Sequence, residues 1–488
     1  MLPQRATQLL FFLVVSLFLI APSTLSAQLY NPVTHTNLAC CPGDPLAVDV
    51  NGDGLADVIG SSGSDMEVWF SNGDGTFQAG SSYPSGGYLA TSFASADLNG
   101  DSSLDLVVLN ACISSADCSS SVLGVLLGNG DGTFGPVVTY NLGRPSYRAA
   151  VVDANGDGKQ DLVFTSAHQV GTLLGNNDGT FQPIQTSDTG FSSTSISLTD
   201  VIGDGKVDLL AIDGVHAAVS LGNGDGTFRL AQVYDSGGVQ PIAIAGTDVN
   251  NDGKKDILIL NKCDAGGSCS SGELGVLLGN GDGTFQGAIS SPTGGRFPSH
   301  MATTLQRNGS LFQLFVTECR HCWRGSGYPG SGRVAMFYGN SDGTLTLANL
   351  FYTGATGYSG AVTLGDVNGD GRLDILETWG IVGVLFHVGR YPTSSLLSSS
   401  PNPSVHGQSV TLTATVSSRL GIPTGFVRFM NGVHCLGKVT MVDGVAALTT
   451  DQLPVGSLPI LALYEPDVSW EKSQATLTQV VNPPSAKE

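Results

Sequence analysis

The segment that decides the fold is a nine-residue acidic stretch, which reads Asp153-Ala154-Asn155-Gly156-Asp157-Gly158-Lys159-Gln160-Asp161. Its spacing, Asp-x-Asn-x-Asp-x-x-x-Asp, returns with starts at Asp49, Asp97, Asp248 and Asp366, and at Asp200 with Ile202 in the third place. An eroded copy from Thr304 to Phe312 keeps the spacing but has lost its carboxylates. Seven units therefore follow one another, 47 to 62 residues apart.

A second signature follows most of these stretches. The string Asn-Gly-Asp-Gly-Thr-Phe starts at Asn72, Asn129, Asn223 and Asn280, with weaker copies at Asn176 and Asn340. In the third unit the chemistry of the residues predicts strands over 149–152, 162–165, 170–174 and 181–186, separated by the acidic loop and by turns. Four short strands repeated seven times predict a β-propeller, in which each sheet buries its faces against its neighbours.

The ends of the repeat region indicate how the ring closes. The last unit stops near Gly389, after its third strand. At the N-terminal side, Tyr30-Asn31-Pro32-Val33 resembles the fourth-strand segment Phe181-Gln182-Pro183-Ile184. We therefore expect residues 30–36 to supply the missing outer strand of the last blade.

The two signatures together resemble the FG-GAP/VCBS repeat of integrin-α-like propellers, over residues 28–391. From Thr393 onward the chain resembles a bacterial Ig-like repeat, in the stretches Ser399–Pro403, Gly407–Ala414 and Pro423–Gly425. Alternating apolar residues at 404–484 independently favour a small antiparallel sandwich. The predicted fold is all-β: a seven-bladed propeller at 28–391, a linker at 392–403 and an Ig-like β-sandwich at 404–484.

The first 27 residues have the pattern of a secretory signal peptide. Arg5 precedes an apolar run from Leu9 to Ile20, and small residues follow up to Ala27. Pro22 ends the run too early for a membrane anchor, and no later segment is long enough to span a bilayer. We expect the protein to be secreted or at the cell surface, where disulfides persist and calcium is abundant.

The acidic stretches offer the ligands that calcium prefers. Ca²⁺ takes six to eight oxygen ligands. In the stretch that starts at Asp153, positions one, three, five and nine carry side-chain oxygens, and position seven can offer its backbone carbonyl. The alternative is a set of Asx-turns that hold no metal. The prediction is five to six structural Ca²⁺ sites, the sixth weakened by Ile202. The predicted ligands are Asp49, Asn51, Asp53, Leu55, Asp57, Asp97, Asn99, Asp101, Ser103, Asp105, Asp153, Asn155, Asp157, Lys159, Asp161, Asp200, Asp204, Lys206, Asp208, Asp248, Asn250, Asp252, Lys254, Asp256, Asp366, Asn368, Asp370, Arg372 and Asp374.

Antiparallel strands place the acidic loops and the Gly-Asp-Gly turns at one end of each sheet, and the remaining loops at the other end. This second end collects arginines and aromatic residues, which suit anionic groups and sugar rings or protein hot spots. The alternative is that the aromatic residues fill the central channel and the arginines are merely solvated. The candidate ligand-binding residues are Tyr88, Arg144, Tyr147, Arg148, Arg296, Phe297, His300, Arg320, Trp323, Arg324 and Trp379.

Six of the nine cysteines form close pairs in the loops between the second and third strands. Cys112/Cys118, Cys263/Cys269 and Cys319/Cys322 are predicted disulfides that staple these loops. The Cys319-Arg320-His321-Cys322 spacing also allows a redox or metal pair. The pairing of Cys40, Cys41 and Cys435 stays open.

The composition narrows the function. A formal net charge of −20 argues against nucleic acid as a partner, because phosphates would be repelled. No nucleophile elbow, nucleotide loop or metal-binding histidine spacing is present. The preferred interpretation is a secreted, calcium-stabilised recognition or adhesion module for an extracellular protein or carbohydrate. The alternatives are a carbohydrate-active lyase or hydrolase that uses the same face, with His168, His216 and His300 as candidates, and a purely structural component of a surface assembly.

Overall fold

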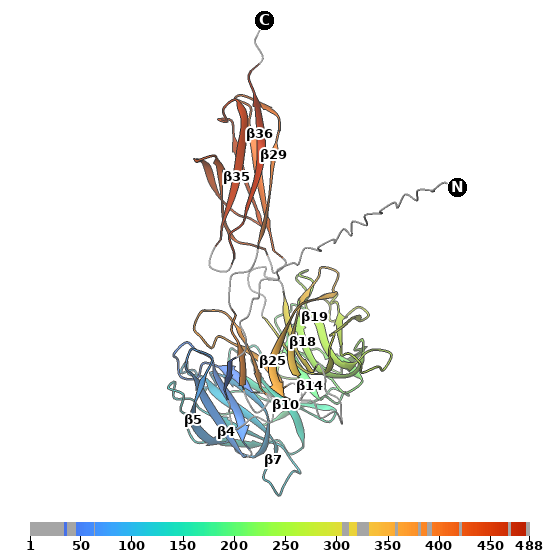
Figure 1. Cartoon of the computed structure of the whole chain (residues 1–488). Coiled ribbons are helices and arrows are strands. Elements are labelled where there is room, and N and C mark those ends of the chain that lie inside the picture. The colour runs from blue at the N-terminus through green and yellow to red at the C-terminus, as the bar shows by residue number, and fades with distance from the viewer. Residues whose placement is uncertain are drawn as a thin grey trace, which may run out of the picture.

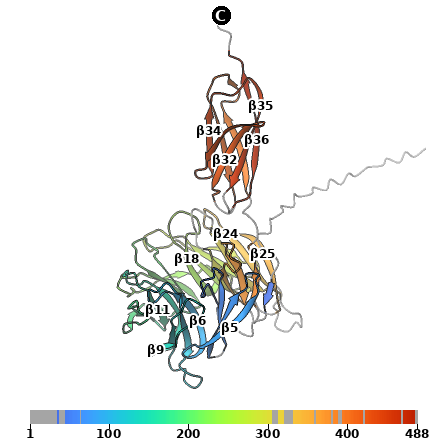
Figure 2. The ribbon, with the colours of Figure 1, turned by 90° about the vertical axis from the view of Figure 1, so that its left-hand side faces the viewer.

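A computed structural model describes residues 34–36, 45–62, 64–304, 312–319, 331–356, 360–378, 382–387, 393–418, 422–466 and 470–484. Within these ranges the regular structure is entirely β, and no helix in them is long and apolar enough to cross a membrane. Figures 1 and 2 show a ring of sheets followed by an elongated sandwich. The predicted signal peptide at 1–27 lies outside the described residues.

Seven four-stranded antiparallel sheets form the first body, and we number them as blades in chain order. Blade 1 contains β2 (Leu46–Val48), β3 (Asp57–Ser62), β4 (Asp65–Ser71) and β5 (Phe77–Pro84). Blade 2 contains β6 (Tyr88–Ala96), β7 (Asp105–Cys112), β8 (Val122–Leu126) and β9 (Val138–Asn141). Blade 3 contains β10 (Ser146–Val152), β11 (Asp161–Ser166), β12 (Gln169–Leu173) and β13 (Gln185–Asp188).

The remaining blades repeat this order. Blade 4 contains β14 (Ser195–Thr199), β15 (Asp208–Ile212), β16 (His216–Ser220) and β17 (Gln232–Asp235), and blade 5 contains β18 (Val239–Thr247), β19 (Asp256–Cys263), β20 (Glu273–Leu277) and β21 (Ile289–Pro292). Blade 6 contains β22 (Arg296–Thr303), β23 (Gln313–Cys319), β24 (Ser331–Gly339) and β25 (Leu345–Thr356). Blade 7 contains β26 (Ala361–Gly365), β27 (Asp374–Thr378) and β28 (Val382–Leu385), together with β1 (Thr34–Thr36).

The blades form a closed ring. The first strand of each blade contacts the first strand of the next, from β2 through β6, β10, β14, β18 and β22 to β26, which contacts β2 again. β1 pairs antiparallel with β28, in the register Thr34↔Val384, His35↔Gly383 and Thr36↔Val382. The N-terminal segment therefore supplies the outer strand of the last blade, as the fourth-strand resemblance predicts, although residues 30–33 lie outside the described part of the chain.

The core of the ring lies between neighbouring blades. The second and third strands are almost completely buried, as in β11 and β20. The Phe that ends the Asn-Gly-Asp-Gly-Thr-Phe string belongs to this core, because Phe134 meets Tyr83 of the preceding blade edge-on at 5.4 Å between ring centroids. Tyr140 with Phe181 and Tyr234 with Phe285 repeat this contact. These repeated Phe residues are therefore packing residues and not ligand-binding aromatics.

The second body is a β-sandwich. One sheet has the order β29 (Ser394–Ser400), β31 (Val410–Ser417), β34 (Val445–Thr450), and the other has the order β30 (Ser404–Val405), β36 (Gln474–Asn482), β35 (Gly456–Pro466), β32 (Gly425–Asn431), β33 (His434–Thr440). The predicted linker at 392–403 is too long, since β29 pairs with β31 along its whole length. Leu397 is buried among the core residues, which gives this serine-rich segment a reason to join the sheet.

Candidate functional site

The acidic loops join the first and second strands of six blades, and each is organised around its first aspartate. In blade 3, Asp153 Oδ1 accepts hydrogen bonds from the backbone amides of Gly156 at 2.7 Å and Asp157 at 3.1 Å. Its Oδ2 accepts from the amide of Gly158 at 2.8 Å. Asp157 Oδ1 accepts from the amide of Lys159 at 3.0 Å. The loop is thus a series of Asx-turns, in which side-chain oxygens replace missing backbone acceptors.

The ninth residue of the loop has a role that the sequence pattern does not reveal. Asp161 is completely buried; its Oδ2 accepts from the amide of Ala154 at 2.9 Å, and its Oδ1 from the amide of Gly175 at 2.7 Å. The carboxylate therefore joins the loop, the start of the second strand and the end of the third. The same pair of hydrogen bonds, donated by two backbone amides, is accepted by the ninth aspartates of the other loops, which are Asp57, Asp105, Asp208, Asp256 and Asp374.

Each loop concentrates negative charge. Burial raises the pKa of Asp57 to about 6, against the lowering effect of its bonds from Ser71 and Val50, and nearby Asp53 and Asp49 raise it further. Burial likewise raises the pKa of Asp256 to about 6 and that of Asp374 to about 7. These shifts show that burial and nearby carboxylates disfavour the charged form of the ninth aspartate.

Two loops offset part of this charge with a lysine at position seven. Lys159 Nζ lies 3.6 Å from Asp157 Oδ2, and Lys206 Nζ lies 3.8 Å from Asp204 Oδ2. Both pairs are partly exposed, so they contribute little to stability. They leave the buried ninth aspartate without a basic partner inside the loop.

The donor set of the loops fits calcium in its chemistry, because all the donors are hard oxygens from Asp, Asn and backbone carbonyls. In the described residues, however, no three or more His, Cys, Asp or Glu side chains are grouped so as to hold a metal ion. In blade 4 the third donor is absent, since Ile202 packs with the apolar cluster between blades 4 and 5. Calcium therefore stays a prediction.

The acidic loops also connect neighbouring blades. The amide of Gly132, in the Gly-Asp-Gly turn of blade 2, donates to the carbonyl of Val50 in the loop of blade 1 at 3.1 Å. Gly179 donates in the same way to Leu98 at 3.1 Å. Between blades 7 and 1, the amide of Ala56 donates to the carbonyl of Asp366 at 2.6 Å. Each of these hydrogen bonds therefore connects an acidic loop to a neighbouring blade.

At the other end of the sheets, three blades share a second repeated motif. It is a Gly-Gly pair followed by two residues, of which the first pairs with a cysteine of the second strand: Tyr88 with Cys112, Val239 with Cys263 and Arg296 with Cys319. We define the rim as the two residues after each Gly-Gly pair. The rim consists of Tyr88 and Leu89 in blade 2, Val239 and Gln240 in blade 5, and Arg296 and Phe297 in blade 6.

The second residue of each rim pair has a left-handed backbone. The φ angles are 59° at Leu89, 58° at Gln240 and 49° at Phe297, although none of these is glycine. A β-bulge follows in each strand, as shown by register shifts between Ala90 and Ser92, Pro241 and Ala243, and Arg296 and His300. Leu89 is 49% exposed and Phe297 is 44% exposed. Such conformations cost about 1–3 kcal/mol each and concentrate at functional sites.

The second glycine of each pair makes the close approach that the rim requires. A Cβ at Gly238 would lie 2.7 Å from Asn261 Cβ and 2.8 Å from the carbonyl oxygen of Cys263. We expect Gly238→Ala to destabilise the protein by about 1–3 kcal/mol through overpacking, measured by chemical denaturation. Gly287→Ala is the matched control, since a Cβ there meets no atom within 4 Å. Equal stability of the two variants would contradict the close-packing role of Gly238.

Disulfides support two of the rim segments. Cys112–Cys118 and Cys263–Cys269 are both formed, which confirms two of the three predicted bridges. Cys322 lies outside the described residues, so the third bridge stays a prediction. Cys40 and Cys41 also lie outside them, and their pairing stays open. Cys435 is a free, exposed thiol on β33. Because Cys112 and Cys263 pair directly with rim residues, each bridge fixes the strand that carries the rim.

Among the predicted ligand-binding residues, the arginines of blade 3 contact other protein groups. Arg148 Nη1 donates to the carbonyl of Thr91 in blade 2 at 3.1 Å, and Arg144 Nη1 donates to Gln169 Oε1. Tyr147 is 45% exposed, whereas His300 is half-buried. Arg320, Trp323, Arg324 and Trp379 lie outside the described residues. Leu89, Val239 and Gln240 are rim residues that the sequence did not point to; the repeated Gly-Gly pair was the available signal.

A carboxylate–histidine pair lies among the described residues at this end of the blades. His216 Nδ1 lies 3.6 Å from Asp213 Oδ2 in the hairpin between β15 and β16. Asp213 Oδ1 accepts from the amides of Val215 and His216, each at 2.7 Å. The pair is therefore part of a tight exposed turn, and its geometry is explained by the turn itself.

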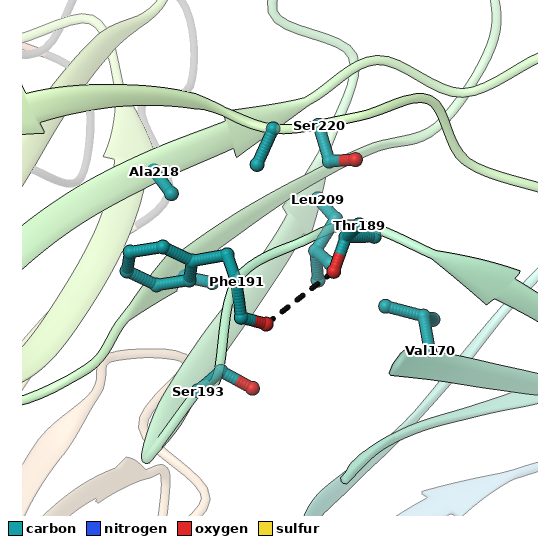
Figure 3. A pocket seen from close by; sticks show the side chains of 9 residues that line it. Val170, Thr189, Phe191, Ser193, Leu209, Ala218 and Ser220 are labelled. Carbon is teal, nitrogen blue, oxygen red and sulfur yellow. Dashed lines mark hydrogen bonds between the residues drawn. The ribbon is translucent and has the colours of Figure 1, made fainter. Parts of the chain in front are cut away.

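A pocket between blades 3 and 4 is shown in Figure 3. The space inside it that a water-sized molecule could occupy is about 10 Å³, and the pocket is lined by Val170, Thr189, Phe191, Ser193, Leu209, Ala211, Ala218, Ser220 and Ala231. Thr189 Oγ1 donates to the carbonyl of Phe191 at 3.4 Å, and no lining residue is charged. This is about the space that one water molecule needs, so the pocket is too small for a small-molecule ligand, and its uncharged lining offers little to orient one. This pocket is therefore not a candidate ligand site.

The fold and the repeated loops define a β-propeller with acidic-loop repeats, joined to a β-sandwich. The FG-GAP-like repeat family matches residues 49–108, 153–211, 200–259 and 323–377, and the bacterial Ig-like domain (group 3) family matches residues 397–482. The chain thus contains FG-GAP-like repeats and a C-terminal bacterial Ig-like domain, and both resemblances seen in the sequence are confirmed.

Solved structures give a more distant likeness. A lectin from Agrocybe aegerita, described as recognising non-reducing terminal N-acetylglucosamine, is 19% identical with a TM-score of 0.40, over 66% of this chain and 80% of that chain. A protein from Lactobacillus plantarum is 14% identical with a TM-score of 0.40, over 80% and 96%. The Photorhabdus luminescens Tc holotoxin pore is 12% identical with a TM-score of 0.33, over 89% of this chain but 20% of that chain. No curated protein matches the sequence.

Proposed function

We propose that the protein is a secreted, calcium-stabilised recognition module that binds an extracellular carbohydrate or protein through its rim. The observation that carries the proposal is the threefold repeat of an exposed, left-handed residue at Leu89, Gln240 and Phe297. A strained backbone persists only where the surrounding structure enforces it. Here a Gly-Gly pair, a bulge and, in blades 2 and 5, a disulfide enforce it together.

The two ends of the ring support a division of roles. The acidic loops bond to their own backbone amides and to the neighbouring blade, which suits a structural role. The rim, in contrast, presents exposed side chains that no such network accounts for. Binding residues are commonly presented in this way, on loops held by a rigid scaffold.

The proposed location outside the cell agrees with the disulfides, because such bridges persist in oxidising compartments. Two of them are formed, and both close exposed loops. Calcium at the acidic loops would neutralise carboxylates that burial and their neighbours make costly to ionise. The ligands that would hold calcium are the side-chain and carbonyl oxygens of the nine-residue loops.

The test compares rim and non-rim variants of the full chain. The parent is screened against arrays of glycans and extracellular proteins, and every ligand is re-measured with Leu89→Ala/Gln240→Ala/Phe297→Ala. We expect at least a tenfold loss of affinity, about 1.4 kcal/mol or more, because exposed contact residues are removed. Leu230→Ala/Val233→Ala is the control, since both residues are exposed on the outer side of blade 4. Unchanged affinity in the rim variant, with its melting curve intact, would refute the proposal.

A further inference from the structure

We infer that the rim of blades 5 and 6 binds an anionic sugar, with Arg296 contacting the charged group and Phe297 contacting the face of the ring. This inference rests on the proposed recognition function of the rim and assigns it a ligand chemistry. It concerns blades 5 and 6 because only there do a rim cation and a rim aromatic ring occur side by side in the chain.

The two rim segments of blades 5 and 6 are physically joined. The amide of Gly272 in blade 5 donates to the carbonyl of Gly295 at 2.8 Å, and the amide of Gly294 donates to Ser271 Oγ at 3.2 Å. Pro298 packs so closely on the same loop that a Cβ at Gly272 would lie 2.4 Å from it. Arg296 and Phe297 are therefore held against the end of the loop that Cys263–Cys269 closes. A binding site gains affinity when its residues are fixed before the ligand arrives.

Arg296 supplies the cation of the inferred site. It is half-buried, and within the described residues its guanidinium group makes no hydrogen bond or ion pair. The other arginine of blade 6 in those residues, Arg333, is paired with the buried Glu318 at 2.6 Å. Lys262 is exposed next to Cys263, and it adds a second positive charge at the end of β19 that lies beside the rim. Asp264 follows Cys263 in the chain, and its Oδ1 accepts from the amide of Ser268 at 2.8 Å inside the loop.

The groups around these cations suit a sugar better than a protein surface. Phe297 is 44% exposed, and an exposed ring can stack on the apolar face of a sugar. Gln240, Ser268 and Ser270 are exposed hydrogen-bonding side chains on the neighbouring segments. Protein hot spots instead need a cluster of large side chains that become fully desolvated. The large apolar residues of the rim are dispersed over three blades and do not form such a cluster.

The net charge of −20 does not oppose this assignment, because most acidic loops are far from the rim. In blade 5, β19 starts at Asp256 of the acidic loop and ends at Cys263 beside the rim. Eight residues of β-strand span roughly 20 Å or more. Charges separated by more than about 8–10 Å at physiological salt are largely screened.

Blade 2 provides an internal control for the chemistry. It has the same Gly-Gly pair, left-handed residue, bulge and disulfide, but its rim pair is Tyr88 and Leu89. The position that corresponds to Lys262, one residue before the paired cysteine, is Ala111. A site for anions should therefore depend on blade 6 and not on blade 2.

The experiment measures binding of the full chain to polygalacturonate, dextran sulfate and neutral dextran by calorimetry at increasing salt. We expect one or both anionic polymers to bind, with affinity that falls as salt rises, and neutral dextran to bind at least tenfold more weakly. Tighter binding of polygalacturonate indicates a site for carboxylates, and tighter binding of dextran sulfate indicates a site for sulfates. Arg296→Gln should reduce anion binding about tenfold or more, since a charge-assisted contact is lost, and Phe297→Ala should also reduce it. Leu230→Ala, an exposed position of blade 4 outside the rim, should leave it unchanged.

Equal binding of neutral dextran, an unaffected Arg296→Gln variant, or no binding of any anionic polymer would overturn the anionic assignment. Melting curves of all variants are measured to check that each is folded. These failures differ from failure of the proposed function: if the triple rim variant still loses a ligand found in the array screen, recognition by the rim stands and only its ligand class changes. A ligand found to be a protein that needs neither Arg296 nor Phe297 would likewise overturn the inference.

Discussion

Removal of calcium with EDTA is expected to lower the melting temperature of the protein by at least about 10 °C. Each ion that binds only the folded state contributes about 2.7 kcal/mol when its concentration is 100 times its Kd. Six loops carry most or all of the predicted ligands, and bonds such as Gly132 to Val50 join these loops to the next blade. The losses therefore act on one ring, and we expect them to add in a single unfolding transition.

The measurement is differential scanning calorimetry of the full chain in excess calcium, in EDTA and in EDTA followed by calcium. Magnesium is the control ion, because it demands near-ideal octahedral geometry and shorter bonds than calcium, and it should restore less of the lost stability. An unchanged melting temperature in EDTA, together with no bound metal after equilibrium dialysis, would show that the loops are Asx-turns without a metal. The fold would be unaffected by that result, since the loops already satisfy their own amides.

The second large effect is expected for Asp161→Ala, which should destabilise the protein by roughly 3–5 kcal/mol with or without calcium. The buried carboxylate accepts two backbone hydrogen bonds, from Ala154 and Gly175, and a bond to a charged group contributes about 1.5–3 kcal/mol. Its loss also leaves two backbone amides without their acceptor inside the protein. Chemical denaturation in EDTA isolates this effect, because any contribution from bound metal is then removed.

The control for this prediction is Asp157→Ala in the same loop. Asp157 is exposed and accepts from the amide of Lys159 within the turn, so its loss should cost less than about 1 kcal/mol in EDTA but should reduce the response to calcium. Equal destabilisation by the two substitutions in EDTA would show that the ninth aspartate does not join the strands as we describe. Blade 6 illustrates the burial of this position, since the completely buried Phe312 replaces the aspartate there.

Much of the fold follows from local sequence. The nine-residue spacing and the Asn-Gly-Asp-Gly-Thr-Phe string act within one hairpin, so they predict the strands and turns of the blades without knowledge of distant residues. The Cys112/Cys118 and Cys263/Cys269 pairs are predictable for the same reason, because the partners are only six positions apart in the sequence. The strand that closes the ring belongs to the last blade although it lies near the N-terminus. The likeness of residues 30–33 to Phe181–Ile184 is enough to predict it.

The rim shows what local patterns could not predict. Arginine and aromatic content pointed to Arg148, but its guanidinium group donates to Thr91, which is 57 residues away in the chain. Leu89 and Gln240 are ordinary residues in the sequence, and only the structure shows their left-handed backbone. The sequence predicted Asp161 as a metal ligand, which stays a prediction. The structure adds that this aspartate accepts two backbone hydrogen bonds.

The amino-acid sequence by itself determined that this chain folds into repeated four-stranded sheets with acidic loops at one end, followed by a sandwich. It did so because spacing, glycine turns and apolar alternation operate over fewer than about ten residues. Only the tertiary structure decided which residues face a ligand and which join the blades. Contacts such as that of Ser71 Oγ with the carbonyl of Val367 connect residues 296 positions apart, and they exist only once the ring has closed.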